Sequence, residues 1–113
     1  MVNDTASDGQ GTLHLFPEID DALGPAPILM QPGDVINMKR AIAWTGRSDK
    51  TLRLWCRKYR IARQSANGSS LEISAPALEM VRYNDLVALE LLRSGVRTHE
   101  RVKRYFDHVG VPV

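Results

Sequence analysis

The chain has 113 residues, 43% of them hydrophobic and 25% charged, and a net charge of +2, which is the composition of one ordinary globular domain. No apolar run approaches the roughly 18 residues of a membrane-spanning helix and no secretory leader is recognisable, so we expect a soluble, cytoplasmic protein of bacterial or phage type. Cys56 is the single cysteine and the three histidines are scattered, which excludes an internal disulfide and a zinc module, and we expect no metal and no cofactor.

Residues 1–33 are predicted to form a flexible acidic arm. They hold five acids and no lysine or arginine, a charge of −5, and eight glycines and prolines interrupt every regular pattern. Such a segment buries too little apolar surface to offset the entropy of ordering its backbone. Two apolar islands, at 13–16 and 28–30, interrupt the arm, and the second is able to lie against the domain.

Two short helices joined by a very tight turn are predicted next. The first covers Met38–Thr45, with Asn37 as its N-cap and Gly46 as its left-handed terminator. The second covers Asp49–Tyr59 behind a Ser48 cap. Its apolar positions fall on one buried stripe: Leu52, Trp55, Cys56 and Tyr59. A glycine and a cap that separate two helices so closely are typical of a helix-turn-helix.

A β-hairpin is predicted after Tyr59, where the helical period ends. The short extended runs Ile61–Gln64 and Leu71–Ile73 flank the pair Asn67-Gly68. Asparagine followed by glycine favours a hairpin turn because both residues accept positive φ. We interpret this hairpin as a wing beside the helix-turn-helix.

The rest of the chain is predicted to be helical. Ser74 caps a long helix that ends at Gly95, with Asn84 as a point where the helix can restart. Its apolar residues form two stripes: Leu78, Val81, Leu89 and Leu92 on one, and Met80, Tyr83, Val87 and Leu91 on the other. Thr98 caps a last helix that ends at Gly110. The inner face of that helix is formed by Val102, Tyr105, Phe106 and Val109.

The predicted fold class is mainly α with a small β-hairpin wing, a winged helix-turn-helix with added C-terminal helices. The arm covers 1–33 and the winged helix-turn-helix domain covers 34–83. Residues 84–113 form a helical extension that packs on the domain or provides an interaction surface.

The positive charge of the chain is concentrated in residues 39–63. This segment holds nine cations and one acid, Asp49, a net charge of +8, whereas residues 64–113 hold six of each sign. A helix that needs only solubility mixes both signs for pairing one turn apart. The lack of acids therefore favours double-stranded DNA as the partner, because phosphate contacts by Lys and Arg release counterions and supply affinity. The candidate DNA-binding residues are Arg47, Ser48, Lys50, Thr51, Arg53, Leu54, Arg57, Lys58, Arg60, Arg63, Asn67 and Ser69.

Several of these residues have a specific expected role. Arg53 and Arg57 can each direct a guanidinium at guanine O6 and N7 in the major groove, a geometry that lysine matches less well. Ser48, Thr51 and the helix N-terminus can bind phosphate oxygens. The aromatic residues of both helices, at helical spacing, are expected to be core, and Cys56 is expected to be a packed thiol.

The stretches 36–41, 45–48 and 51–57, followed by 71–74, resemble the small winged helix-turn-helix domain of phage and plasmid excisionases and of MerR-type regulators. The resemblance covers residues 35–83, and its most specific parts are the Thr-Gly-x-Ser turn and the Thr-Leu-Arg-x-Trp core of the second helix. It implies that the hairpin tip, 67–70, approaches the DNA backbone or minor groove. It also implies that five residues face the major groove: Ser48, Lys50, Arg53, Leu54 and Arg57.

Three functions remain open at this point. The first is an excisionase-like architectural factor of a mobile element, acting beside a recombinase or a second copy of itself. The second is a small transcriptional regulator of a phage or mobile element, with a DNA-recognition protein like a terminase small subunit as a variant. The third is a protein-interaction module that docks an acidic partner. Motifs for phosphate-binding loops, nucleophile elbows and metalloproteases are missing, so we expect no enzyme.

Overall fold

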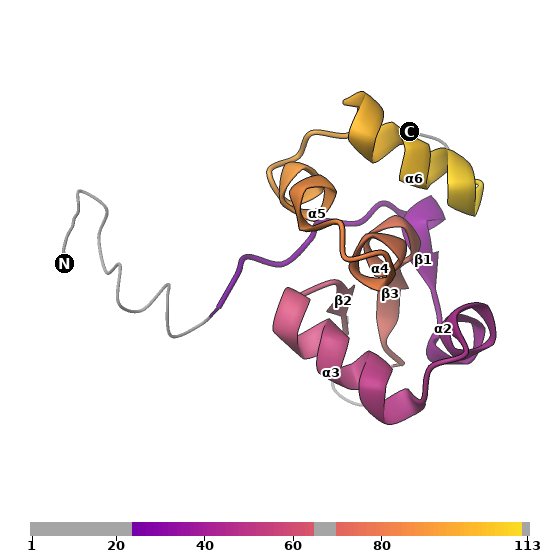
Figure 1. Ribbon diagram of the computed structural model, residues 1–113. Coiled ribbons are helices and arrows are strands. Elements are labelled where there is room, and N and C mark those ends of the chain that lie inside the picture. Colours follow the sequence, from indigo (N-terminus) through magenta and orange to yellow (C-terminus); the bar gives the residue numbers. More distant parts are fainter. Residues whose placement is uncertain (1–23, 65–69, 112–113) are drawn as a thin grey trace, which may run out of the picture.

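Five α-helices and three short β-strands follow one another in residues 24–64 and 70–111, which the computed structural model describes (Figure 1). The elements are η1 (Pro32–Asp34), β1 (Val35–Ile36), α2 (Met38–Thr45), α3 (Asp49–Tyr59), β2 (Ala62–Arg63), β3 (Glu72–Ser74), α4 (Ala75–Arg82), α5 (Leu86–Arg93) and α6 (Glu100–Val109). The predicted fold class, mainly helical with a small hairpin, is confirmed. None of the described helices is long and apolar enough to cross a bilayer.

The helix-turn-helix has the predicted boundaries because local caps set them. The Asn37 side chain accepts a hydrogen bond from the Arg40 amide at 2.8 Å and opens α2. Gly46 ends α2 with φ of 68°, in the left-handed region that glycine adopts without steric cost. The Ser48 hydroxyl accepts from the Thr51 amide at 3.2 Å and opens α3. Such caps contribute about 1 kcal/mol each.

The sheet has three antiparallel strands with β3 at its centre. The predicted hairpin is present in β2 and β3, with Ala62 opposite Ile73, although β2 is shorter than expected and β3 is shifted by one residue. Strand β1 was not predicted, because two residues are too few to produce an alternating pattern. It adds Ile36 beside Ile73, so that both pack under the helices. The turn residues Asn67 and Ser69 lie outside the described residues.

The predicted long C-terminal helix is two helices, α4 and α5. Asn84 takes a left-handed φ of 56°, which breaks the helix, and the Asp85 carboxylate caps α5 by accepting from the Ala88 amide at 3.1 Å. The expected cap of the last helix, Thr98, is wrong by one residue. His99 stands directly before α6, and its Nδ1 accepts from the Arg101 amide at 3.0 Å, so an imidazole nitrogen replaces the hydroxyl.

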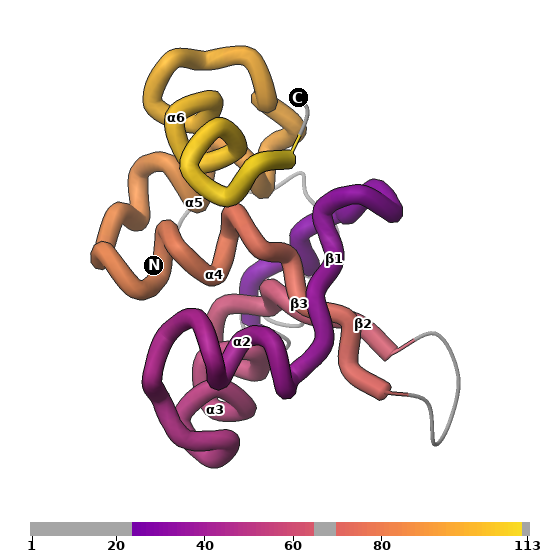
Figure 2. Tube along the Cα trace, turned by 90° about the vertical axis from the view of Figure 1, so that its right-hand side faces the viewer, coloured from indigo at the N-terminus to yellow at the C-terminus, as the bar shows by residue number. Residues whose placement is uncertain are grey.

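Helix α4 is the centre of the core. Figures 1 and 2 place it between α6 on one side and α2 and α3 on the other. The first predicted stripe of the C-terminal helices is buried throughout, whereas the second is divided by the break at Asn84: Met80 is buried, but Tyr83 and Val87 are exposed. The largest fully buried side chains are Phe106, Ile28, Leu52, Ile61, Ile73, Leu78, Met80, Leu89 and Val102.

The folded body begins earlier than the predicted boundary at residue 34. Ile28 is 2% exposed, and its amide donates to the Arg60 carbonyl at 2.9 Å. The buried Asp34 carboxylate pairs with the Arg97 guanidinium at 3.1 Å. The described part of the predicted arm therefore includes core residues, and residues 1–23 lie outside the described part.

Replacing Ile28 by alanine is expected to lower the free energy of unfolding by about 2–4 kcal/mol, because it leaves a cavity in the core. The matched control is Leu29→Ala at the neighbouring position, where the side chain is 82% exposed. That change is expected to stay within about 0.5 kcal/mol. Urea unfolding of both variants measures the difference. Equal stabilities would show that the segment around residue 28 is not part of the folded body.

Candidate nucleic-acid interface

The outward face of α3 is cationic, as predicted. Leu52 and Cys56 are buried, and Trp55 and Tyr59 are partly buried against the core, so the aromatic residues pack as expected. The exposed side chains of the helix include five of the candidate residues: Lys50, Arg53, Leu54, Arg57 and Lys58. A face that carries four cations and an exposed leucine can contact both phosphates and the methyl group of thymine.

An open hollow of about 500 Å³ lies between α3 and the β2–β3 hairpin, and four arginines line it. We call it the four-arginine hollow, after Arg53, Arg57, Arg60 and Arg63. The first two lie one helical turn apart on α3. Arg60 ends the helix with a left-handed φ of 54°, which reverses the chain so that Arg63 on β2 comes back alongside α3. Its remaining lining residues are Cys56, Ala62, Gln64 and Leu71.

Two arginines of the hollow hold exposed carboxylate partners. Arg53 Nε lies 2.6 Å from Asp49 Oδ1, and Arg63 Nε lies 2.7 Å from Glu72 Oε1. All four side chains are more than a third exposed, and ion pairs of this kind contribute about 1 kcal/mol or less. A phosphate oxygen can therefore replace either carboxylate at low cost.

Six further cations of the basic segment have no carboxylate partner among the described residues. They are Lys39, Arg40, Arg47, Lys50, Arg57 and Lys58. Three of these side chains lie over aromatic rings instead: Arg40 over Trp44 at 5.5 Å, Arg47 over Trp55 at 5.9 Å and Lys58 over Tyr59 at 5.3 Å. Cation–π contacts orient these groups and leave their charge uncompensated.

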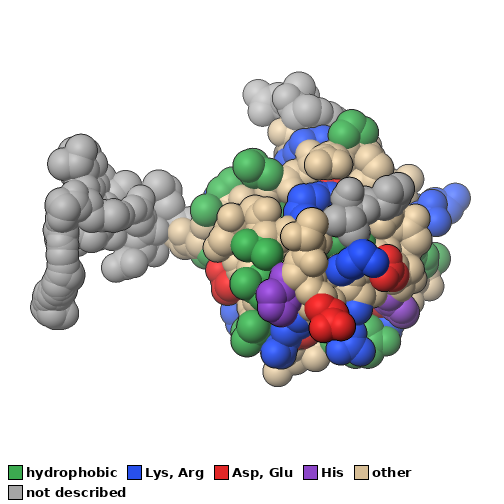
Figure 3. All heavy atoms as spheres, turned by 90° about the horizontal axis from the view of Figure 1, so that it is seen from above, with side chains coloured by type: hydrophobic (Ala, Val, Ile, Leu, Met, Phe, Trp, Pro, Cys, Tyr) green, Lys and Arg blue, Asp and Glu red, His purple; other side chains and the backbone are tan. Residues whose placement is uncertain are grey.

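The C-terminal helices carry a compensated charge. The helix cations Arg82, Arg93, Arg101 and Lys103, and Arg97 in the loop between α5 and α6, each pair with a carboxylate. Figure 3, which views the molecule from the α6 side, accordingly shows cationic and acidic side chains next to each other. Arg104 is exposed and is the one cation of these helices with no carboxylate partner in the described chain. The uncompensated positive charge is therefore concentrated on α2 and α3.

Two of the predicted DNA-binding residues, Ser48 and Thr51, are already engaged in hydrogen bonds. The Ser48 hydroxyl is already the N-cap of α3 and also donates to Thr51 Oγ1 at 3.1 Å, so a phosphate has to compete for both hydroxyls. Lys39 and Arg40, on α2, were missed as candidates. They could have been identified from the sequence, because both belong to the +8 segment. The first helix of a helix-turn-helix crosses the DNA backbone, so cations on α2 can contact phosphates.

Cys56 borders the hollow, but its thiol is expected to have low reactivity. It is buried, as predicted, and burial raises the pKa of its thiol to about 11, even though Arg53 and Arg57 act in the opposite direction. At pH 8 only about one thiol in a thousand is then ionised, and the thiolate is the reactive form.

Cys56 in the native protein is therefore expected to react slowly with a disulfide reagent at pH 8. The rate should rise about tenfold per pH unit toward pH 11, because the thiolate fraction rises in that proportion. Urea-unfolded protein is the control, and it should react at the rate of an ordinary thiol. Fast labelling of the native protein at pH 8 would contradict the burial.

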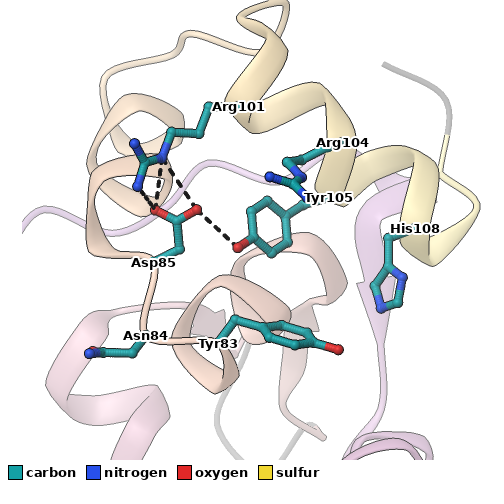
Figure 4. Close-up of a pocket in the computed structure, with 7 residues that line it drawn as sticks. All are labelled: Tyr83, Asn84, Asp85, Arg101, Arg104, Tyr105 and His108. Carbon is teal, nitrogen blue, oxygen red and sulfur yellow. Dashed lines mark hydrogen bonds and ion pairs between the residues drawn. The ribbon is translucent and has the colours of Figure 1, made fainter.

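A second hollow, of about 700 Å³, lies between the α4–α5 turn and α6, on the far side of α4 from α3 (Figure 4). Its lining residues are Tyr83, Asn84, Asp85, Arg101, Arg104, Tyr105 and His108. The Asp85 carboxylate accepts from Arg101 Nε at 3.1 Å and from the Tyr105 hydroxyl at 2.9 Å. This network was not predicted, because it joins residues from two helices. It fastens α6 to the α4–α5 turn.

The same network shifts two pKa values. Burial alone would raise the pKa of Asp85, but the hydrogen bonds from Arg101, the Ala88 amide and Tyr105 outweigh burial and lower it below 3.8. Burial and the hydrogen bond to Asp85 raise the pKa of Tyr105 to about 12. A carboxyl whose pKa is lowered by folding stabilises the fold above its ordinary pKa, and this contribution is lost as the pH falls through the lowered value.

The variant Asp85→Asn is expected to lose about 1–3 kcal/mol of stability at pH 7, because hydrogen bonds to a charged group are lost. The loss should shrink as the pH falls below 3.8, because the unfolded wild-type chain then takes up a proton while the folded carboxyl, whose pKa is lowered, is still ionised. Asp107→Asn is the control, since its pair with Lys103 is exposed. Chemical unfolding between pH 3 and pH 7 measures both. A loss that does not change with pH would contradict this role of the carboxylate.

No protein-family model, curated protein or solved structure matches this chain. In residues 24–64 and 70–111 there is also no group of three or more His, Cys, Asp or Glu side chains that could hold a metal ion. The residues and their geometry therefore carry the functional inference.

Proposed function

We propose that this protein binds double-stranded DNA with α3 in the major groove and with the β2–β3 hairpin beside the backbone. The observation that carries the proposal is the four-arginine hollow next to an exposed cationic helix face, in a domain whose C-terminal cations are mostly paired. A helix face that only has to be solvated does not require unpaired cations on one part of the domain and paired cations on another.

The dimensions of the site support this proposal. Helix α3 has 11 residues and is about 16 Å long, and the major groove, about 12 Å wide, admits a helix of this kind. DNA carries one negative charge per about 1.7 Å, so the hollow can contact consecutive phosphates. Arg57 lies at the border of the helix face and the hollow, and it has no carboxylate partner in the described chain. It is therefore the arginine best placed to bind DNA without first breaking an ion pair.

For the biological role we favour an excisionase-like architectural factor of a mobile element that binds and bends DNA beside a recombinase. The support is the resemblance of residues 35–83 described above. A transcriptional regulator or a packaging protein would use the same surface. Footprinting on DNA that flanks the gene separates these roles, because direct repeats with bending favour the first and palindromic half-sites one helical turn apart favour a regulator.

The central test is the variant Arg57→Ala in a fluorescence-anisotropy titration of a duplex of about 30 base pairs. Removing this cation is expected to weaken binding by about 1–3 kcal/mol, which is about 5-fold to 150-fold, and to reduce the salt dependence by about one counterion. Arg104→Ala is the charge-matched control on α6, and it should change the affinity by less than about twofold.

Equal losses in the two variants would place the contact elsewhere. Absence of binding at low salt would overturn the proposal and favour a module that docks an acidic protein. If Arg57→Ala weakens all sequences equally, the side chain contacts phosphate. A loss confined to one sequence would assign it to a base pair.

A further inference from the structure

We propose that residues 1–23 of this chain, which we call the acidic segment, bind the four-arginine hollow and compete there with DNA phosphate. The competition rests on the proposed function, whereas the contact itself does not. The acidic segment holds Asp4, Asp8, Glu18, Asp20 and Asp21 and no lysine or arginine.

The structure fixes the chain directly after the acidic segment to the rim of the hollow. The Ile28 amide donates to the Arg60 carbonyl at 2.9 Å, and Arg63 Nη1 donates to the Met30 carbonyl at 3.3 Å. Both partners are residues of the hollow itself. Arg93 adds a clamp, because its guanidinium donates both to the Ala26 carbonyl and, at 2.8 Å, to the Tyr59 carbonyl at the end of α3. The acidic segment therefore ends only a few residues before the point where the chain is fixed to the hollow.

The nearest acids can reach every arginine of the hollow. Asp20 and Asp21 precede Ala26, which Arg93 holds, by six and five residues, and an extended chain spans about 3.3 Å per residue, so their reach is about 16–20 Å. Arg53 lies seven residues before Arg60, the residue directly after α3, a distance of about 10 Å along the helix axis. A short tether of this kind gives an effective concentration in the millimolar range. Half occupancy at that concentration needs a binding free energy of about −4 kcal/mol, which several ion pairs formed together have to supply.

The charges of the hollow favour this occupant. Two of its arginines hold exposed carboxylate partners, Asp49 and Glu72, and Arg57 has no carboxylate partner among the described residues, so positive charge remains uncompensated there. Most cations on the α4–α6 side already hold a carboxylate, which leaves less for the acidic segment to bind there. The acidic segment and DNA would bind the same guanidinium groups, and both interactions weaken as the salt concentration rises.

The expected consequence is a lower DNA affinity at low salt and a more stringent choice of site. A random duplex offers only phosphates, which the acidic carboxylates replace. A specific site adds base contacts that the acidic segment cannot replace. Because the tether and the hollow belong to one chain, this effect does not depend on protein concentration.

The test compares two full-length variants with the same charge change. Asp20→Asn with Asp21→Asn removes the acids closest to the tether point, and Asp4→Asn with Asp8→Asn removes acids 20 or more residues from Ile28, where the effective concentration is several-fold lower. Deletions have to stop at residue 23, since Ile28 is part of the core.

The first readout needs no DNA. The side-chain Nε–Hε NMR signals of Arg57 and Arg60 at 50 mM salt should move in the Asp20/Asp21 variant and move less in the Asp4/Asp8 variant. The second readout is the affinity for a random duplex at 50 mM and 300 mM salt. The Asp20/Asp21 variant should bind about 3-fold to 10-fold more tightly at 50 mM, and this gain should disappear at 300 mM.

The outcomes separate the two proposals. Unchanged arginine signals in the Asp20/Asp21 variant overturn the contact. Equal gains in DNA affinity in both variants overturn it as well, because they would reflect only the change in net charge. Arginine signals that move as expected in a protein that binds no duplex support the contact and overturn the proposed DNA binding. Signals and affinity that change together, with the expected salt dependence, support both.

Discussion

The reversal of the chain at Arg60 is the constraint on which the four-arginine hollow depends. A residue other than glycine in the left-handed region costs about 1–2 kcal/mol, and the surrounding contacts have to offset this cost. Here the Arg60 carbonyl accepts from Ile28, and the Ile61 carbonyl that follows accepts from Ser74 at the end of β3. Arg60 thereby ends α3, starts the hairpin and holds the N-terminal segment around Ile28 in place. Without this reversal, Arg63 would continue away from the arginines of α3.

Helix α4 holds the other half of the architecture in place. Its buried residues include one charge, Glu79, whose carboxylate pairs with Arg82 at 2.9 Å and with His108 at 3.1 Å. A buried carboxylate is tolerated only when its lone pairs are satisfied. Glu79 therefore fixes where α6 lies against α4, and the Asp85 network fixes the other end of α6. The C-terminal helices complete the core under α3 and leave its outer face exposed.

The sequence was sufficient to predict those features that local chemistry determines. The bounds of α2 and α3 follow from Asn37, Gly46 and Ser48, whose capping acts over three residues, and the buried stripe of α3 follows from its helical period. The convergence of Arg53, Arg57 and Arg63 was not predictable in this way. It depends on the left-handed backbone conformation of Arg60, which no sequence pattern indicates. The burial of Ile28 and the strand β1 were missed for a related reason. Each involves too few residues for a period, and their stability comes from partners distant in the sequence.

The distribution of ion pairs divides the cations of this chain into two kinds. Arg97 is 18% exposed, lies 4.5 Å from the centre of the Phe106 ring and pairs with the Asp34 carboxylate, which is 3% exposed. Removal of Arg97 would leave a buried carboxylate unpaired, a change that typically costs 3–5 kcal/mol. The exposed cations of α2 and α3 compensate no buried charge, so the fold does not require them. Positive charge that folding does not need, and that aromatic rings in part orient, supports the proposal of a polyanionic partner.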